Sequence, residues 1–258
     1  MNDFSGLKAI VTGGASGIGE ASAIRLAEEG ARVVCADLNL EGAEATSKKI
    51  AAMGGTANSY KIDIADSAQC NALAADTLNR YGSIDILVNN AAISSTGTVE
   101  SNSSEEWALN FNINVIGMAR TSRNALPLLR KSKHAAIVNT CSVAATSGIP
   151  MRALYSATKG AVLSLTMAMA TDHLKDGVRV NCVNPGTADT PWVQRLLAKA
   201  ADPAKEKAAL EARQPLGRLV SPREVASAIC YLASPLQAST TGISLPVDGG
   251  LQYLRIPK

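Results

Sequence analysis

The chain has 258 residues, of which 47% are hydrophobic and 18% charged, and a formal net charge of +3. This length allows a large buried core, and the composition is that of a globular protein rather than a disordered chain. The sequence contains no run of about five like charges, so it does not predict nucleic-acid binding. No uninterrupted apolar stretch of about 18 residues occurs, and no basic segment followed by an apolar one opens the chain. We therefore expect neither a membrane span nor a secretion signal.

Five cysteines are scattered along the chain and form no CxxC motif or Cys/His cluster. Several lie inside apolar runs, where a free thiol behaves as a small hydrophobic side chain. The pattern predicts no disulfide framework and no metal site, and it favours a cytoplasmic protein.

Short apolar runs alternate with longer amphipathic segments. Strands are predicted at residues 7–11, 32–36, 57–62, 84–88, 135–140, 178–183 and 243–247. Most are apolar at both alternating positions, which is typical of parallel strands covered on both faces. Helices are predicted at residues 19–29, 42–53, 67–81, 105–130, 156–174 and 222–232. Gly30, Gly54 and Gly82 follow the first three, where a helix commonly ends in a left-handed residue.

This alternation over residues 1–258 predicts one α/β domain, a Rossmann-type, doubly wound parallel sheet of seven strands. The Ala/Lys/Glu-rich segment 194–214 interrupts the rhythm after the sixth strand. We expect it to form one or two exposed helices near the carboxyl end of a strand. That position suits a substrate lid, although a solvated helix pair is an equal interpretation.

The first strand runs directly into a glycine-rich turn and then an amphipathic helix. Glycines let the backbone turn sharply and approach a pyrophosphate, whose charge is favoured by the helix N-terminus. A glycine-rich turn alone is weak evidence, but its place between strand and helix strengthens the prediction of a dinucleotide site. The residues concerned are Gly13, Ser16, Gly17, Ile18 and Gly19.

Asp37 ends the second predicted strand, and Leu38 follows it. A carboxylate there accepts hydrogen bonds from both ribose hydroxyls and repels a 2′-phosphate. No Arg or Lys adjoins Asp37, and Ser16 rather than a basic residue stands in the glycine turn. The sequence therefore favours NAD over NADP.

Polar residues also follow the third and fourth strands. Asp63 and the Ile64 amide could reach an adenine edge, and Asn89 and Ala91 lie in the next such turn. Both segments equally suit ordinary strand-to-helix turns, because Asp and Asn cap helices and bond local backbone.

Tyr155 and Lys159 stand four residues apart in a predicted helix, so they project from one face. An ammonium close to a phenol in a shielded site favours the ionised phenol, which makes proton exchange possible near neutral pH. Such pairs are also common on helix surfaces. Ser142 favours the catalytic interpretation, because it lies at the carboxyl end of the fifth strand, where open α/β sheets bind their ligands.

With these motifs the chain resembles the short-chain dehydrogenase/reductase family over essentially its full length. The matching segments are Thr12–Gly19, Asn89–Ala92, Asn114, Ser142, Tyr155–Lys159, Pro185–Gly186 with Thr190, and Val247–Gly250. One departure is Ala92, where the family usually has Gly.

The resemblance implies that Tyr155 is the general acid/base and that Ser142 orients the substrate oxygen. It implies that Lys159 supports Tyr155 and holds the nicotinamide ribose. Asn114, with Asn112 as a competing candidate, would hold a water that links Lys159 to solvent. The positions that would flank the nicotinamide are Pro185, Gly186, Thr187 and Thr190.

The resemblance also implies a homotetramer, built through the helices that carry Asn114 and Tyr155 and through the tail, residues 251–258. Apolar residues in that tail, such as Leu254, are expected to dock on a neighbouring subunit.

The segments that would line the substrate pocket are 92–99, 143–154 and 187–214, which contain few aromatic residues. Guanidinium groups bind carboxylates bidentately, so we expect a small, polar, anionic substrate. Its candidate contacts, besides Ser142 and Tyr155, are Arg152, Trp192, Arg195 and Arg213. Each arginine could instead form a surface or interface ion pair.

The expected reaction is the NAD-dependent oxidation of a secondary hydroxyl in a 2-keto-3-deoxy sugar acid, of the 2-keto-3-deoxy-L-fuconate type. Residues 185–192 resemble bacterial sugar and sugar-acid dehydrogenases of the family, including those of L-fucose breakdown. A neutral aldose 1-dehydrogenase is the first alternative and a 3-oxoacyl reductase, disfavoured by Asp37, the second. An NAD-binding scaffold or sensor is a non-enzymatic alternative, which Ser142, Tyr155 and Lys159 disfavour. The only partner expected besides further subunits is a small-molecule substrate.

Overall fold

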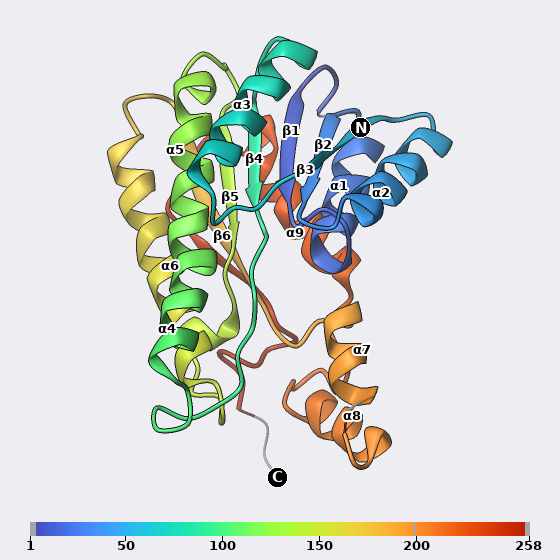
Figure 1. Cartoon of the computed structure of the whole chain (residues 1–258), viewed down its shortest axis with the longest axis vertical. Coiled ribbons are helices and arrows are strands. Elements are labelled where there is room, and N and C mark those ends of the chain that lie inside the picture. Colours follow the sequence, from blue (N-terminus) through green and yellow to red (C-terminus); the bar gives the residue numbers. More distant parts are fainter. Residues whose placement is uncertain (1–3, 199, 256–258) are drawn as a thin grey trace.

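The computed structural model describes residues 4–198 and 200–255. Its strands form one parallel sheet of seven, in the order β3-β2-β1-β4-β5-β6-β7 (Figure 1). The order reverses between β1 and β4, which is the switch point where sheets of this kind bind their ligands. Each strand lies within two residues of its predicted position. The strands are β1 (Lys8–Thr12), β2 (Arg32–Asp37), β3 (Thr56–Lys61), β4 (Ile86–Asn89), β5 (Ala136–Thr140), β6 (Arg179–Pro185) and β7 (Ser244–Val247).

Helices cover both faces of the sheet and enclose two separate cores. One core lies under α1 (Gly17–Glu28), α2 (Leu40–Ala52) and α9 (Pro222–Ala233). The other lies under α3 (Ser67–Tyr81), α5 (Met118–Leu129) and α6 (Ala153–Asp172). The central strands are buried throughout, because apolar helices cover them on both sides. The predicted doubly wound α/β fold is thereby confirmed.

The helix predicted at residues 105–130 is wrong as one continuous α-helix. It consists of α4 (Ser104–Phe111), a π-helical segment η1 (Asn112–Gly117) and α5. Within η1 the Asn114 side chain forms two hydrogen bonds with the backbone of Ile93, a residue outside the helix. Periodicity along the chain cannot show such a contact, and π segments are frequent at functional sites.

The segment after β6 forms two helices, α7 (Pro191–Ala198) and α8 (Pro203–Ala212). They stand apart from the helices that cover the sheet (Figure 1). The first begins before the predicted limit of residue 194, because a proline is favoured at the first position of a helix. Two short 3₁₀ turns, η2 (Val143–Ala145) and η3 (Pro235–Gln237), complete the elements.

In the described part of the tail, residues 251–253 form a turn, and Tyr253 and Leu254 are exposed. Residues 256–258, on which the predicted subunit contact also depends, lie outside the described residues. Among the residues that the structure describes, no helix is long and apolar enough to cross a membrane, and no group of three His, Cys, Asp or Glu could hold a metal ion.

Candidate active site

The glycine-rich turn between β1 and α1 keeps its backbone free of side chains. Gly13 and Gly17 have left-handed backbone angles (φ +69° and +58°), and a Cβ at Gly19 would collide with the Gly13 carbonyl oxygen. The side chain of Ser16 does not cap α1, so the first amide groups of the helix, including that of Ile18, keep their donors for a ligand. This cradle, which a Cβ would fill, fits the pyrophosphate of a dinucleotide.

Asn90 ties this turn to the end of β4. Its Nδ2 donates hydrogen bonds to the carbonyl oxygens of Thr12 and Gly13 at 3.2 and 3.3 Å. The backbone amides of Asn90 and Ala91 donate to the Thr12 hydroxyl at 3.0 and 3.2 Å. Our sequence reasoning gave no role to Asn90 or Thr12, although both belong to the matching motifs, because these contacts join segments 77 to 79 residues apart.

Asp37 lies at the carboxyl end of β2, beside the same turn. Its Oδ2 accepts a hydrogen bond from the Ala15 amide at 3.0 Å, and its Oδ1 accepts one from the Asn39 amide at 2.9 Å. These two bonds orient the carboxylate, whose remaining lone pairs can still accept ribose hydroxyls. Leu38 beside it is exposed. The structure therefore places Asp37, the residue predicted to bind the ribose, beside the turn predicted to bind the pyrophosphate.

The turns after β3 and β4 are used mainly for local structure. The Asp63 carboxylate accepts the Ala65 amide at 2.8 Å, and the Asp63 amide donates to the Gln69 side chain. Ile64 is buried against Gly117 of the π segment. The Asn89 side chain lies in the interior and is saturated there, so only its backbone is left for the predicted cofactor contact. The role of these turns stays a prediction.

The segment after β6 returns to the glycine turn. Thr190 lies against Gly17, where an added Cβ would come within 3.2 Å of the threonine methyl group. Gly186 is enclosed by Gln214 and Asp248, and a Cβ there would meet the Gln214 amide oxygen. Thr190 thus lies beside the glycine turn, and the role of Pro185, Gly186, Thr187 and Thr190 at a nicotinamide stays a prediction.

Tyr155 and Lys159 lie on one face of α6, and the Lys159 Nζ is 5.6 Å from the centroid of the Tyr155 ring. The Lys159 side chain is only 2% exposed. Its Nζ donates a hydrogen bond to the Thr140 carbonyl at the end of β5, at 2.8 Å. The two side chains are therefore placed together on the catalytic face of α6, with the lysine anchored to the sheet.

Ser142 and Asn114 approach this pair from two other elements. Ser142 precedes η2, and its hydroxyl accepts the Ala144 amide at 3.1 Å, which leaves its own proton available for donation. Asn114 is fully buried, and its Nδ2 donates to the Ile93 carbonyl at 2.8 Å and the Thr158 hydroxyl at 3.2 Å. Its Oδ1 accepts the Ile93 amide. Both Nδ2 protons of Asn114 are thus used, and the relay water at this residue stays a prediction.

A buried polar network sets the position of α6 on the sheet. Asn89 donates to the Asn139 Oδ1 at 3.0 Å, and Asn139 donates to the Thr166 hydroxyl of α6 at 2.9 Å. The Cys141 thiol donates to the Lys159 carbonyl at 3.2 Å. Satisfied buried networks of this kind rigidify a core. They hold the helix that carries Tyr155 and Lys159.

Arg152 precedes α6 and is held by its Nη1 alone. This atom donates to the Ser95 carbonyl at 2.9 Å and to the hydroxyls of Thr96 at 2.7 Å and Ser94 at 3.5 Å. Burial lowers the pKa of Arg152 and Tyr155 opposes this effect, while the charges of Arg213 and Glu206 lower and raise the pKa, respectively. Among the described residues, no carboxylate pairs with this guanidinium, and its Nε and Nη2 have no hydrogen-bond partner.

The other predicted substrate contacts differ in how close they come. Trp192, at the start of α7, stacks on Arg152 with 5.4 Å between the guanidinium carbon and the ring centroid. Arg213 is exposed at the end of α8, near enough for its charge to act on Arg152. Arg195 is exposed on α7, and no contact within the described residues links it to the site. The structure thus brings Trp192 into contact with Arg152, whereas no contact among the described residues joins Arg213 or Arg195 to them.

Comparison with known proteins decides the family. A family profile described as enoyl-(acyl carrier protein) reductase matches residues 13–252. A short-chain type dehydrogenase/reductase from Mycobacterium marinum superimposes with a TM-score of 0.91 at 31% identity, covering 98% of each chain. This chain belongs to the short-chain dehydrogenase/reductase family.

Two further family members differ in the substrates that their names state. The cis-4-hydroxycyclohexanecarboxylate dehydrogenase of Sinomonas cyclohexanicum is 38% identical over 248 residues, covering 96% of this chain and 97% of its own. The aldohexose dehydrogenase of Thermoplasma acidophilum is 32% identical with a TM-score of 0.88, covering 100% of this chain and 99% of its own.

Membership of the short-chain dehydrogenase/reductase family makes this chain an oxidoreductase that acts on CH–OH groups. The family typically uses a nicotinamide cofactor, and the glycine cradle and Asp37 fit one. The predicted family, fold and enzyme class are therefore confirmed, whereas the substrate is not determined by these comparisons.

Proposed function

We propose that this chain is an NAD-dependent dehydrogenase that oxidises a secondary hydroxyl of a small, polar, anionic substrate of the 2-keto-3-deoxy sugar acid class. The observation that carries the proposal is Arg152. This half-buried guanidinium lies next to Tyr155 and has no carboxylate ion-pair partner among the described residues. Its Nε and Nη2 are therefore left for bidentate binding of a substrate carboxylate.

In this reaction Tyr155 takes the proton of the substrate hydroxyl while Ser142 donates a hydrogen bond to the same oxygen. Lys159 stabilises the phenolate and holds the nicotinamide ribose. When bound, the nicotinamide accepts the hydride. Asn114 keeps the π segment against Ile93, where its backbone can hold a water on the path from Lys159 to solvent.

The preference for NAD rests on Asp37. Its carboxylate, oriented by the amides of Ala15 and Asn39, would repel the 2′-phosphate of NADP. The remaining cofactor contacts that we propose are those predicted from the sequence, with Asn89 acting through its backbone.

The proposal is tested by NADH formation over a panel of 2-keto-3-deoxy sugar acids, 4-hydroxycyclohexanecarboxylate, aldohexoses and 2,3-butanediol. We expect hydroxy acids to be oxidised with the highest kcat/KM. We expect NAD to be preferred over NADP by at least about tenfold, because one unfavourable charge contact between Asp37 and the 2′-phosphate changes the affinity by about that factor. A preference for neutral sugars or for NADP would contradict the proposal.

Replacement of Arg152 separates anion binding from catalysis. We expect Arg152→Met to raise the KM for hydroxy acids about 10- to 100-fold, because a charge-assisted pair is lost, and to change kcat/KM for neutral alcohols little. Arg130→Met serves as the matched control, because Arg130 pairs with Asp176 at the end of α5. Equal losses on acids and neutral alcohols would show that Arg152 does not bind a carboxylate.

A neutral aldose 1-dehydrogenase is the second candidate, supported by the likeness to the aldohexose dehydrogenase. The same panel decides between the two. The 3-oxoacyl reductase alternative is supported by 33% identity over 248 residues to a 3-oxoacyl-[acyl-carrier-protein] reductase of Thermotoga maritima. Asp37 argues against it, because reductive synthesis usually consumes NADPH.

We further propose a homotetramer in the cytoplasm. Ile116 and Met167, on the π segment and α6, are about half exposed, as expected for side chains that a neighbouring subunit covers. All five cysteines are free and buried, which suits a reducing compartment.

A further inference from the structure

Helices α7 and α8 form a unit with a small core of its own. That core consists of Val193, Leu197, Leu210 and Leu219 and is separate from the two cores of the sheet. The unit joins the body through a narrow stem, where Ala188 and Val220 form an isolated parallel bridge. In this bridge the Asp189 amide donates to the Val220 carbonyl at 2.8 Å, and the Val220 amide donates to the Thr187 carbonyl at 3.0 Å.

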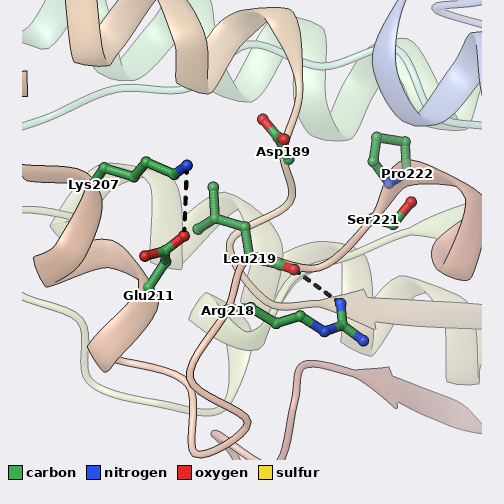
Figure 2. Close-up of a pocket in the computed structure, with 7 residues that line it drawn as sticks. All are labelled: Asp189, Lys207, Glu211, Arg218, Leu219, Ser221 and Pro222. Atoms are coloured by element: carbon green, nitrogen blue, oxygen red, sulfur yellow. Dashed lines mark hydrogen bonds and ion pairs between the residues drawn. The ribbon is translucent and has the colours of Figure 1, made fainter. Parts of the chain in front are cut away.

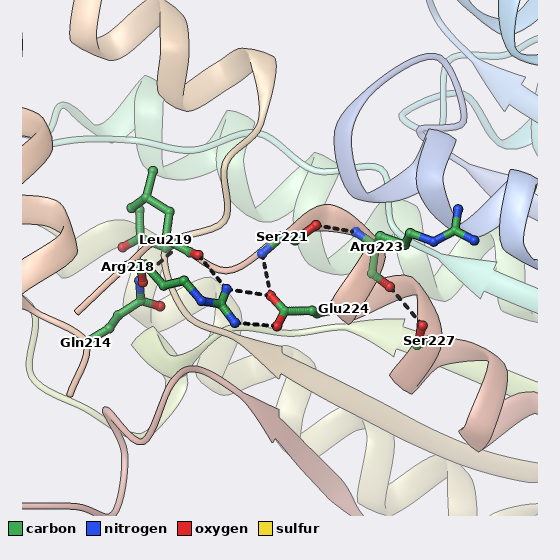
Figure 3. Close-up of polar contacts among 8 residues, drawn as sticks. Gln214, Arg218, Leu219, Ser221, Arg223, Glu224 and Ser227 are labelled. Atoms are coloured by element: carbon green, nitrogen blue, oxygen red, sulfur yellow. Dashed lines mark hydrogen bonds and ion pairs between the residues drawn. The ribbon is translucent and has the colours of Figure 1, made fainter. Parts of the chain in front are cut away.

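The base of this unit is braced without any contact to the catalytic residues. Arg218 forms a bidentate pair with Glu224 at the start of α9 (Figure 3). A hollow beside the bridge between Ala188 and Val220 has a volume of about 250 Å³. Figure 2 shows the two acidic and two basic side chains among the residues that line it. Its charged side chains are Asp189, Lys207, Glu211 and Arg218.

Trp192 is where the two-helix unit meets the catalytic side of the molecule. Its ring lies 5.4 Å from the guanidinium carbon of Arg152, which the body holds through Nη1. The backbone there is constrained, because Met151 has a left-handed φ of 58° and Gly97 forms a bridge with Arg152. The guanidinium is thus held on one edge by hydrogen bonds to residues 94–96, and its face lies against the Trp192 ring of α7.

Arg213 brings a second guanidinium to this place from the other end of the unit. Its charge acts on Arg152 in the sense that lowers the pKa of the latter. Glu206 of the same unit acts on Arg152 in the opposite sense. A carboxylate bound at Arg152 would attract both guanidinium groups and offset the repulsion between them.

We propose that Trp192 is a positioning residue that holds the Arg152 guanidinium for an anionic substrate. The inference rests on the proposed function, whose anion-binding group is Arg152. It adds that Trp192 contributes to the binding of anionic substrates more than to that of neutral ones.

Fluorescence tests this role of Trp192 without turnover. The chain has two tryptophans, so Trp107→Phe leaves Trp192 as the reporter. With NAD present, cyclohexanecarboxylate, which carries the anion but no reacting hydroxyl, should give a saturable shift in Trp192 emission, and cyclohexanol should give none. In Arg152→Met the Kd from this shift should rise at least about tenfold. No shift with the carboxylate, or an equal shift with cyclohexanol, would overturn the inference.

Kinetics of Trp192 variants test the positioning role. Trp192→Leu should raise the KM for 4-hydroxycyclohexanecarboxylate about fivefold, through loss of the cation–π contact, and should raise the KM for cyclohexanol by a smaller factor. Trp192→Phe should restore most of the loss. Equal losses on both substrates would mean that Trp192 acts only as a wall of the pocket. If cyclohexanecarboxylate shifts the Trp192 emission but no hydroxy acid is oxidised, the proposed function fails and the role of Trp192 in anion binding stands. If hydroxy acids are oxidised but the emission does not shift, the proposed function stands and the role of Trp192 fails.

Discussion

Lys159 shows how much a single contact decides at this site. Its ammonium is buried, yet it has no carboxylate partner among the described residues and donates to the Thr140 carbonyl instead. A carbonyl holds the ammonium in place without neutralising it, so the full charge acts on the Tyr155 ring. A salt bridge at the same position would weaken the electrostatic effect of the ammonium on the Tyr155 ring.

Tyr155→Phe should lower kcat by about 10²- to 10⁴-fold, the usual contribution of a positioned acid/base, and should leave the Kd for NADH nearly unchanged. Steady-state kinetics and cofactor titration measure the two quantities. Tyr231→Phe is the control, because Tyr231 is an exposed tyrosine of α9. A variant with turnover within tenfold of the native enzyme would remove Tyr155 from the mechanism.

Two elements illustrate how local chemistry places the site. In the π segment η1, two hydrogen bonds join the Asn114 side chain to the Ile93 backbone. The chain therefore departs from α-helical geometry at the residue that faces the site. Helix α9 starts with a capping box between Ser221 and Glu224. Glu224 also pairs with Arg218, so the same carboxylate both starts the helix and braces the α7–α8 unit.

The Glu224 carboxylate predicts a pH-dependent stability. Its hydrogen bonds with the Arg218 side chain and then the Ser221 amide lower its pKa from 4.5 to about 2. A group with a lowered folded-state pKa stabilises the fold above its unfolded value, and this is lost as pH falls through the folded value. Glu224→Gln should therefore lower stability at pH 7 by about 1 kcal/mol or less, since the pair is largely exposed.

This difference between Glu224→Gln and the native chain should shrink as pH falls from 4.5 towards 2. Thermal unfolding at fixed protein concentration measures it across that range. Glu44→Gln, at a carboxylate without a salt bridge among the described residues, is the control. A difference that does not depend on pH would show that Glu224 acts through its shape and not its charge.

At the scale of the whole molecule, Arg179 joins segments that are distant in sequence. It starts β6, is 9% exposed and donates to four carbonyl oxygens. These belong to Leu232, Ala233, Ser234 and Thr240, at 2.7 to 3.3 Å. Burial lowers its pKa, but the carbonyls at the end of α9 favour a cation there. One side chain thus ties the central sheet to α9 and to the turn before β7.

Arg179→Met should destabilise the protein by about 3 kcal/mol, because buried carbonyls lose their donors. Arg179→Lys should have a stability between those of Arg179→Met and the native chain, since a single ammonium cannot reach all four acceptors. Chemical denaturation measures both, and kcat of the folded fraction should not change. Equal stability of Arg179→Met and the native chain would mean that water replaces the guanidinium.

The sequence by itself determined the order of elements, the parallel sheet and the positions of the glycine turn, Asp37, Ser142, Tyr155 and Lys159. It could do so because strand periodicity, glycine at strand–helix turns and the spacing of a helical face are local properties. The π segment inside the predicted helix 105–130 was missed, because its cause is a contact with Ile93, in another turn.

Only the tertiary structure decided which side chains meet. It brought Trp192 into contact with Arg152 but, among the described residues, neither Arg213 nor Arg195, turned Asn89 into the interior and gave Asn90 the task of holding the glycine turn. These contacts depend on the packing of segments far apart in the chain. In a parallel sheet the carboxyl ends of all the strands lie at the same edge, so many loops could supply a side chain there. Composition shows that arginines are present, but packing alone determines which of them lies half-buried beside Tyr155 without a carboxylate partner among the described residues.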